Sequence, residues 1–415
     1  MARHHPPVAP GGSRQDPAPR PPASGVRLAA VLRAGLRRAG QPAARMPPGH
    51  RKVIAALLRC RTPALGGHRY RCAECGAEHF APHSCRDRHC PLCQGGAARE
   101  WLARQQAALL PCGYFHVVFT LPHALNGLVR QNQARLYRLL FDCSSQTLLE
   151  FGRNNLGARP GITAVLHTWG QNLKDHYHIH CIVTAGGLSA DGRGWLPSHP
   201  RYLFPVRALS AVFRAKFCAG LRALHGRGKL ELHGALLPLA QGREFARWLA
   251  PVAQSPWTIY SKRPFAGPEQ VLAYLSRYTH RVAISERRLV ALNEPQATVR
   301  FRWRDYADAG RTKTMTLHAG EFLRRWRLHI LPERFVKIRH YGLLANRDRQ
   351  IHLQQARAAL GIDAHTAAAA PDNSDPAQAP PPHRPICPHC GRPALLLLER
   401  VPPARAPPPS ILNPA

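Results

Sequence analysis

The stretch Tyr177-His178-Ile179-His180-Cys181-Ile182-Val183-Thr184-Ala185 decides how the rest of the chain is interpreted. It is rich in β-branched residues and is followed by two glycines, so we expect a strand that ends there. Alternate side chains of a strand share one face, which places His178 and His180 side by side. Two imidazoles on one face form half of a metal site, although two hydrogen-bonded core histidines would give the same pattern.

The composition of the chain is strongly basic. Its 415 residues include 58 Lys and Arg but only 23 Asp and Glu, which gives a formal net charge of +35. Such a charge favours nucleic acid as a partner, because each phosphate that is neutralised releases counterions. The sequence has no apolar run of about 18 residues, and its start lacks the apolar centre of a signal peptide. We therefore expect a cytoplasmic protein with no membrane contact.

The 12 cysteines of such a protein are better read as metal ligands than as disulfides. Cys72-x-x-Cys75 and Cys90-x-x-Cys93 have the spacing of the two halves of a four-cysteine zinc site, so we predict that they share one ion. The other potential ligands in this block could form a second, interleaved zinc site or remain free of metal. They are Cys60, His68, Cys85 and His89.

The composition also changes along the chain. We expect a disordered basic arm at 1–25, a helix plus zinc-binding domain at 26–110, a large catalytic domain at 111–350, a helix end and Ala/Pro linker at 351–386, and a tail at 387–415. The tail holds a lone Cys387-x-x-Cys390. Nearby histidines could complete that half-site, another chain could, or it is a remnant.

A helix predicted to begin at Pro268 carries Tyr274 and Tyr278 on one face, one turn apart. Two phenols and two imidazoles suit attack on a phosphodiester: a divalent cation held by the histidines would polarise the phosphate while a tyrosine oxygen attacks it. The products would be a 5'-phosphotyrosine and a free 3'-hydroxyl, and the reaction could run backwards to join strands. Packing of the two rings on a sheet is the competing interpretation.

Basic side chains accompany these motifs. Residues 298–306 alternate apolar and basic side chains, which predicts a hairpin with residues 312–317 and a row of arginines on one face. The expected DNA-binding side chains are Lys262, Arg277, Arg281, Arg300, Arg302 and Arg304. Bases could also stack on Trp303, Trp326 or Tyr341, unless these rings belong to the core.

Several of these strings together resemble a known family. They are LHTWGQNL at 166–173, HIH at 178–180 and YLSRYTHR at 274–281. They resemble the rolling-circle insertion-sequence transposases of the HUH class, the insertion sequence 91 family. The cysteine block, with RDRHCPLCQ at 86–94, is similar to the N-terminal zinc-binding domain of that family.

The resemblance implies an α+β fold, in which an HUH endonuclease-type antiparallel sheet is flanked by helices and preceded by a small zinc-binding domain. It implies structural zinc, Mg²⁺ or Mn²⁺ at His178 and His180, and Tyr274 and Tyr278 as nucleophiles, with Tyr278 favoured if only one acts. His167 and Gln171 are candidates for a third metal ligand, and hydrogen bonding at the sheet edge would explain either residue equally well.

The implied function is a DNA transposase that nicks and rejoins single-stranded or hairpin DNA at element ends, by a rolling-circle route, near the bacterial nucleoid. A plasmid or phage rolling-circle replication initiator would use the same chemistry. A non-catalytic zinc-dependent DNA-binding protein would account for the charge and the cysteines alone. The chain has no Gly-x-x-x-x-Gly-Lys-[Ser/Thr] loop, so we expect host replication and helicase factors to unwind the DNA.

Overall fold

The strand expected around the paired histidines is β5 (Asp175–Ser189), a central strand of the main antiparallel sheet. The structure is a computed structural model, and it describes residues 25–38, 46–106, 108–265, 271, 282–362 and 384–404. Within these residues the strand order is β11-β4-β5-β3-β7, and β6 pairs with the end of β5. The other strands are β3 (Tyr114–Thr120), β4 (Ala158–Trp169), β6 (Trp195–Pro197), β7 (Ile259–Phe265) and β11 (Ile338–Gly342).

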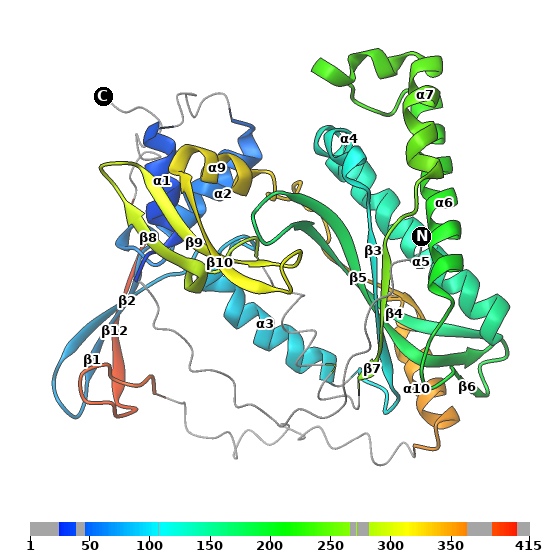
Figure 1. Ribbon diagram of the computed structural model, residues 1–415. Coiled ribbons are helices and arrows are strands. Elements are labelled where there is room, and N and C mark those ends of the chain that lie inside the picture. The colour runs from blue at the N-terminus through cyan, green and yellow to red at the C-terminus, as the bar shows by residue number, and fades with distance from the viewer. Residues whose placement is uncertain are drawn as a thin grey trace.

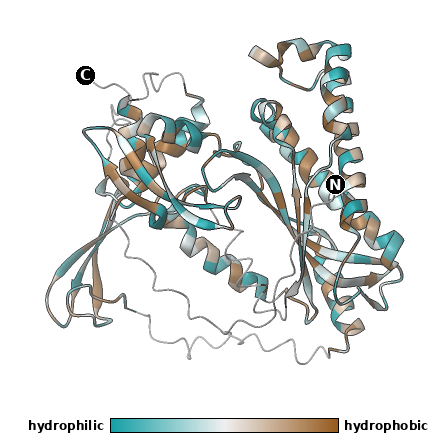
Figure 2. Ribbon diagram, viewed as in Figure 1, coloured by the Kyte–Doolittle hydropathy of each residue, from teal (hydrophilic) through white to brown (hydrophobic). Residues whose placement is uncertain are grey.

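Helices cover one face of this sheet (Figure 1). Ile179, Cys181 and Val183 of β5 point into that core, so the alternate residues His178 and His180 point to the opposite face. The covering helices are amphipathic, and most carry both teal and brown bands in Figure 2. They are α4 (Asn126–Gln131), α5 (Gln133–Leu156), α6 (Val206–Gly226) and α7 (Gly242–Gln254).

A second core joins segments from distant parts of the sequence. Blue helices near the N-terminus pack beside the yellow sheet and helix of residues 289–327 (Figure 1). Gly35 permits this contact, because a Cβ atom there would lie 2.7 Å from the carbonyl oxygen of Ala319. The elements are α1 (Leu28–Arg38), α2 (Pro48–Arg59), β8 (Leu289–Asn293), β9 (Thr298–Asp305), β10 (Arg311–His318) and α9 (Ala319–Arg327).

A small three-stranded sheet, in the order β12-β1-β2, lies beyond this core. Its strands are β1 (Gly67–Cys72), β2 (Glu78–Pro82) and β12 (Leu395–Val401). The remaining helices are α3 (Pro91–Gln106) and α10 (Arg349–Ala359). Short 3-10 turns are η2 (Pro63–Leu65), η3 (His123–Leu125), η4 (Gly234–Ala240) and η5 (Glu286–Arg288).

The expected fold class is confirmed: the fold is α+β, with antiparallel sheets flanked by helices. The hairpin predicted from the alternation in residues 298–317 is β9 and β10. Of the helix predicted after Pro268, only Val271 lies within the described residues. Among the helices of the described ranges, none is long and apolar enough to cross a membrane.

Candidate active site and cysteine clusters

Three histidines meet on the face of the main sheet that α5 and α6 leave uncovered. His178 and His180 come from β5, and His167 comes from the neighbouring β4, where it pairs with His178. One ring nitrogen from each lies within 4.8 Å of the others, and all three side chains are buried. The structure therefore brings His167, one of the two candidates for a third ligand, to the predicted pair.

Hydrogen bonds fix the orientation of two of these rings. His178 Nδ1 lies 2.7 Å from the carbonyl oxygen of His176, to which it donates. His180 Nδ1 lies 2.8 Å from Nε2 of His116 on β3. Burial, and then the charge of Lys262, lower the pKa of His116 to about 4, so its ring is neutral and the two imidazoles share one proton in this hydrogen bond. With both Nδ1 atoms in these hydrogen bonds, Nε2 is the nitrogen through which His178 and His180 would bind a metal ion, the arrangement usual for metal-bound histidines.

His116 is a site residue that the sequence interpretation missed. The signal was a histidine inside an otherwise apolar strand, Tyr114–Thr120. The pairing of β3 with β5 places His116 opposite Ile182, on the same face as His180. That register cannot be read from either strand alone.

Gln171, the other candidate ligand, lies past the end of β4 in the turn before β5. Its backbone carbonyl accepts a hydrogen bond from Arg288, and it lines a groove with His176 and Arg304. The ring of His167 instead stacks on Trp169, with centroids 4.8 Å apart. Of the two candidates, His167 is therefore the one positioned with the histidine pair.

Tyr274, Tyr278, Arg277 and Arg281 lie outside the described residues. Val271, three positions before Tyr274, is buried in a cluster with Trp101, Tyr114 and Ile182. Ile182 lies two residues after His180 on β5, so it shares the histidine face of the sheet. Tyr114 pairs with Thr184, two residues further on, and therefore lies on the same face. The chain therefore reaches the histidine face at the point where the tyrosine segment begins.

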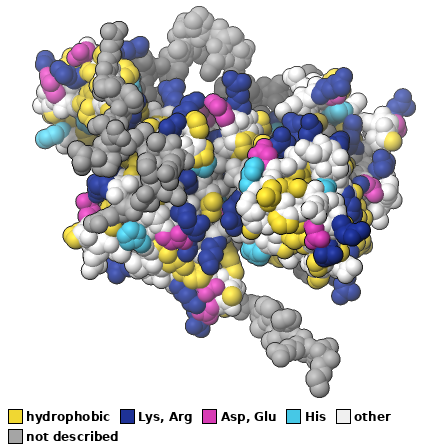
Figure 3. All heavy atoms as spheres, turned by 90° about the horizontal axis from the view of Figure 1, so that it is seen from above, with side chains coloured by type: hydrophobic (Ala, Val, Ile, Leu, Met, Phe, Trp, Pro, Cys, Tyr) yellow, Lys and Arg dark blue, Asp and Glu magenta, His cyan; other side chains and the backbone are white. Residues whose placement is uncertain are grey.

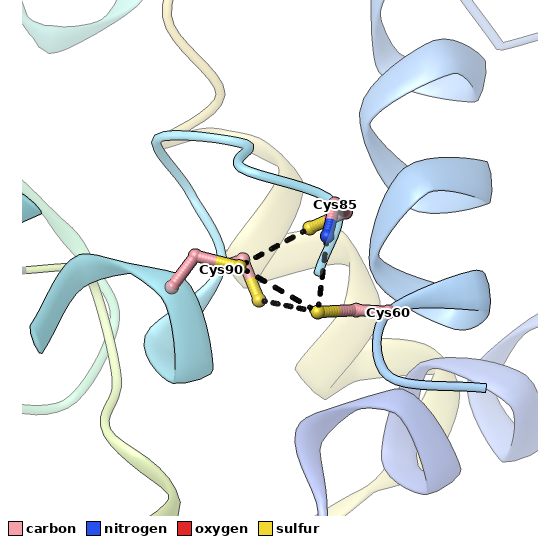
Figure 4. Close-up of side chains that lie close together, drawn as sticks. Cys60, Cys85 and Cys90 are labelled. Carbon is pink, nitrogen blue, oxygen red and sulfur yellow. Dashed lines mark hydrogen bonds between the residues drawn. The ribbon is translucent and has the colours of Figure 1, made fainter. Parts of the chain in front are cut away.

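Four cysteines form a cluster inside the second core, which we call the enclosed cluster: Cys60, Cys85, Cys90 and Cys93. Cys60 follows α2, while Cys90 and Cys93 lie at the start of α3. Figure 4 shows Cys60, Cys85 and Cys90 pointing toward one another. The measured Sγ–Sγ distances are 3.6 to 3.7 Å. A tetrahedral zinc ion with Zn–S bonds of about 2.3 Å separates its sulfurs by about 3.8 Å, so the geometry fits zinc.

A second set, which we call the ribbon cluster, consists of Cys72, Cys75, Cys387 and Cys390. The structure thus contradicts the prediction that Cys72 and Cys75 share an ion with Cys90 and Cys93. The C-x-x-C spacing is the same in each pair and cannot show which pairs meet. Here β1 and β2 direct Cys72 toward the tail, whereas the ends of α2 and α3 bring Cys60 to Cys90.

The two histidines proposed for a second zinc site have other contacts. The ring of His68 packs edge-on against His83 at 4.8 Å. His89 Nδ1 lies 2.9 Å from an Asp87 carboxylate oxygen, and its Nε2 accepts from the backbone N–H of Leu331 at 3.1 Å. Neither histidine belongs to a metal-type cluster within the described part of the chain.

The predicted basic face of the hairpin is present. Arg300 and Arg304 are exposed on β9 while Val299 and Phe301 are buried beneath it. Arg302 is partly exposed, and Lys262 is exposed on β7. Figure 3 shows Lys and Arg side chains spread over the visible face, with fewer acidic ones. Trp326 is only 2% exposed and belongs to the core, whereas Trp303 and Tyr341 are partly exposed.

Comparisons with known proteins agree with this arrangement. A family model described as "Putative transposase" matches residues 161–351, and one described as "Transposase zinc-binding domain" matches residues 33–121. The "Putative transposase y4qJ" of Sinorhizobium fredii is 49% identical over 314 residues, which is 75% of this chain and 78% of that protein. The chain belongs to the insertion sequence 91 family of transposases.

A further relative of this transposase is the "Transposase for insertion sequence element IS801" of Pseudomonas savastanoi pv. phaseolicola. It is 29% identical over 305 residues, 71% of this chain and 70% of the relative. No solved structure matches the chain. The zinc-binding match and the two cysteine clusters together support structural zinc in this transposase. Cys387 and Cys390 lie outside both matched regions.

Proposed function

We propose that this transposase nicks one DNA strand at an element end and rejoins it through a 5'-phosphotyrosine, as rolling-circle transposition requires. The observation that carries the proposal is the set of three buried histidines on one sheet face, two of them held by a hydrogen bond at Nδ1. Buried imidazoles gathered for packing alone would not need this matched orientation.

His167, His178 and His180 would hold the catalytic metal through their ring nitrogens. Imidazole donors suit transition ions, so this set fits Mn²⁺ better than Mg²⁺, which prefers oxygen ligands. When bound, the ion would polarise the scissile phosphate as a Lewis acid. His116 would act as a positioning residue: with its Nε2 accepting from His180 Nδ1–H, it would fix the ring so that His180 binds the metal through Nε2.

The nucleophile would be the phenolic oxygen of Tyr278 or Tyr274. As it bonds to phosphorus and gives up its proton, the bond from phosphorus to the 3' oxygen breaks, and that oxygen takes up a proton to leave as a hydroxyl. One phosphoester replaces another, so the same site can rejoin the strand. Val271, which precedes Tyr274 by three positions, is buried on the histidine face, and this supports the proposal that a tyrosine acts at that face.

The DNA strand would reach the histidines along the groove beside the β4–β5 turn. Lys174, Arg304 and Arg324 contribute cationic side chains to its lining, together with Trp303 and with His176, whose ring centroid lies 4.7 Å from that of His178. Cationic side chains would contact the phosphates, and a partly exposed tryptophan offers a surface on which a base can stack. Host replication and helicase factors in the cytoplasm would supply the single strand.

An adduct assay tests the tyrosine chemistry. The protein is incubated with a single-stranded oligonucleotide of the element's end and Mn²⁺ or Mg²⁺, and covalent protein–DNA adducts are separated by denaturing electrophoresis. We expect an adduct that the double variant Tyr274→Phe/Tyr278→Phe does not form. Tyr202→Phe is the matched control, because Tyr202 is 54% exposed and remote in sequence from both motifs, and it should keep the adduct. Absence of an adduct from the unmutated protein with every divalent ion would contradict the proposal.

The role of His116 is tested by metal titration of the same reaction. His116→Phe removes the acceptor for His180 Nδ1, and we expect the Mn²⁺ concentration for half-maximal cleavage to rise about 10- to 100-fold. His116→Gln retains an acceptor oxygen and should restore part of the affinity. Equal metal dependence in all three proteins would show that His116 has no positioning role.

A further inference from the structure

The tail of the chain meets the N-terminal cysteine block. Cys72 Sγ lies 3.7 Å from Cys390 Sγ, and Cys75 Sγ lies 3.8 Å from Cys387 Sγ. These distances equal the edge of about 3.8 Å expected for four sulfurs around one zinc ion. We infer that Cys72, Cys75, Cys387 and Cys390 bind one zinc ion, so that residues 384–404 complete a zinc ribbon begun more than 300 residues earlier.

The two halves of the ribbon cluster have the same backbone geometry. In the first, Cys72 N–H donates to Ala77 and Gly76 N–H donates to Cys72, at 2.9 and 3.0 Å. In the second, Cys387 N–H donates to Arg392 and Gly391 N–H donates to Cys387, at 2.8 and 2.9 Å. Gly76 and Gly391 occupy the same left-handed conformation, with φ of 69° and 73°. Two matching C-x-x-C-G turns that face each other are the two knuckles of a zinc ribbon.

Strand pairing joins the same two segments. β12 pairs with β1 over the full length of β1, from Gly67 opposite Val401 to Cys72 opposite Leu395. The red strand lies beside the blue ones in Figure 1. Arg392 also forms an ion pair with Glu74, at 2.8 Å. The tail therefore supplies the third strand of the sheet as well as half of the ligands.

Zinc is needed because the ribbon has little core of its own. Its buried hydrophobic cluster consists of two of the ligands, Cys72 and Cys387, with Ala394 and Leu395. So small an apolar cluster does not stabilise a fold without a metal or another cross-link. The metal thus determines whether the tail stays on the N-terminal domain. This inference is independent of the phosphotyrosine chemistry proposed above.

Zinc counting on the full-length chain tests the site. We expect two zinc ions per chain in the unmutated protein, and one in each of Cys72→Ser/Cys75→Ser, Cys387→Ser/Cys390→Ser and the variant that combines all four changes. If the combined variant loses no more zinc than either double variant, the four cysteines share one site. Cys218→Ser, a buried cysteine outside both clusters, should retain two. Two zinc ions in Cys387→Ser/Cys390→Ser, or fewer in the combined variant than in either double variant, would overturn the inference.

A cleavage experiment covers the case in which these variants fail to fold. A specific protease site is inserted after Asp372, and the folded protein is cut there. The fragment that carries Cys387 and Cys390 should stay bound in zinc buffer and separate when a chelator is added. Separation of the fragment while zinc is present would refute the inference that zinc joins the tail to Cys72 and Cys75. The inference would also be refuted if the unmutated protein were a dimer with two zinc ions per chain that became monomeric in Cys387→Ser/Cys390→Ser. In that case the tail of one copy would complete the zinc site of the other.

Discussion

The enclosed cluster and the ribbon cluster each bring four cysteine sulfurs to a similar spacing, but they differ in what surrounds the sulfurs. Cys60 and Cys90 are 4% and 2% exposed and lie in a core with residues of α1, α2, β9 and α9. In the ribbon cluster Cys75 and Cys390 are exposed, and the apolar cluster around the buried ligands is small. The ligands of the first come from 34 consecutive positions (60 to 93), whereas those of the second come from both ends of the chain.

This difference separates two uses of structural zinc. In the enclosed cluster the metal adds to hydrophobic burial, and its loss would leave cysteines without a partner inside a packed core. In the ribbon cluster the metal takes the place of a core and fastens one segment to another. The first zinc should therefore affect the stability of the whole second core, while the second should affect only the attachment of the tail.

The largest expected effect comes from removing one ligand of each cluster. Cys90→Ser should lower the Tm of the main unfolding transition by more than about 10 °C, because structural zinc contributes several kcal/mol and a domain of this size shifts by about 2–4 °C per kcal/mol. Cys390→Ser should leave that transition within about 2 °C of the unmutated protein, since its cluster has almost no core. Scanning calorimetry in zinc buffer measures both. Equal shifts would mean that the two clusters stabilise the same cooperative unit.

A smaller effect is expected where α1 packs against α9, in the second core that also holds the enclosed cluster. In Gly35→Ala the new Cβ would lie 2.7 Å from the Ala319 carbonyl oxygen and 2.9 Å from Leu323 Cβ, so the helices must separate. We expect a loss of about 1–3 kcal/mol in the free energy of unfolding, the usual cost of overpacking. Denaturant unfolding measures it.

Gly49→Ala is the matched control for Gly35→Ala. Gly49 lies in α2, and its added Cβ would have no neighbour within 4 Å. Because alanine is the better helix former, the stability of this variant should be unchanged or raised by up to about 1 kcal/mol. If both variants lost the same stability, close contact between α1 and α9 would not be the cause.

These contacts show what the sequence could and could not predict. The paired histidines, the alternating hairpin and the zinc-type cysteines depend on local periodicity and spacing, and each could be recognised from neighbouring residues. Gly35 is an unfavourable residue for an isolated helix, and its role is a contact with α9 nearly 290 positions away, which the local pattern cannot show.

The prediction of how the cysteines group was wrong, and His116 was missed, for the same physical reason. Three C-x-x-C pairs, with Cys60 and Cys85, can combine in several ways, and only the pairing of β1 with β12 selects Cys387 and Cys390 as partners of Cys72. Likewise His116 reaches His180 through strand register. Long-range pairing of this kind is decided by the global fold, which local patterns do not encode.

The smallest effect concerns the contact between the main sheet and the segment that follows α9 in the second core. His329 is buried after the end of α9, where its Nδ1 accepts from the Thr168 hydroxyl at 3.2 Å and its Nε2–H donates to the Leu173 carbonyl at 3.1 Å. Burial lowers the pKa of His329 to about 4. The neutral ring therefore joins β4 and the β4–β5 turn to the second core.

The sign of the pH effect follows from that shift. The unfolded chain takes up a proton on this histidine below about pH 6.5, whereas the folded chain does so only near pH 4, so stability falls as pH falls through that window. Between pH 7.5 and 5.5 we expect His329 to account for about 1 kcal/mol of lost stability. His329→Gln should lack that part of the slope, and Cys390→Ser should keep it, because the ribbon cluster plays no part in this contact. Denaturant unfolding at the two pH values compares the three proteins, and a slope unchanged in His329→Gln would show that another group titrates.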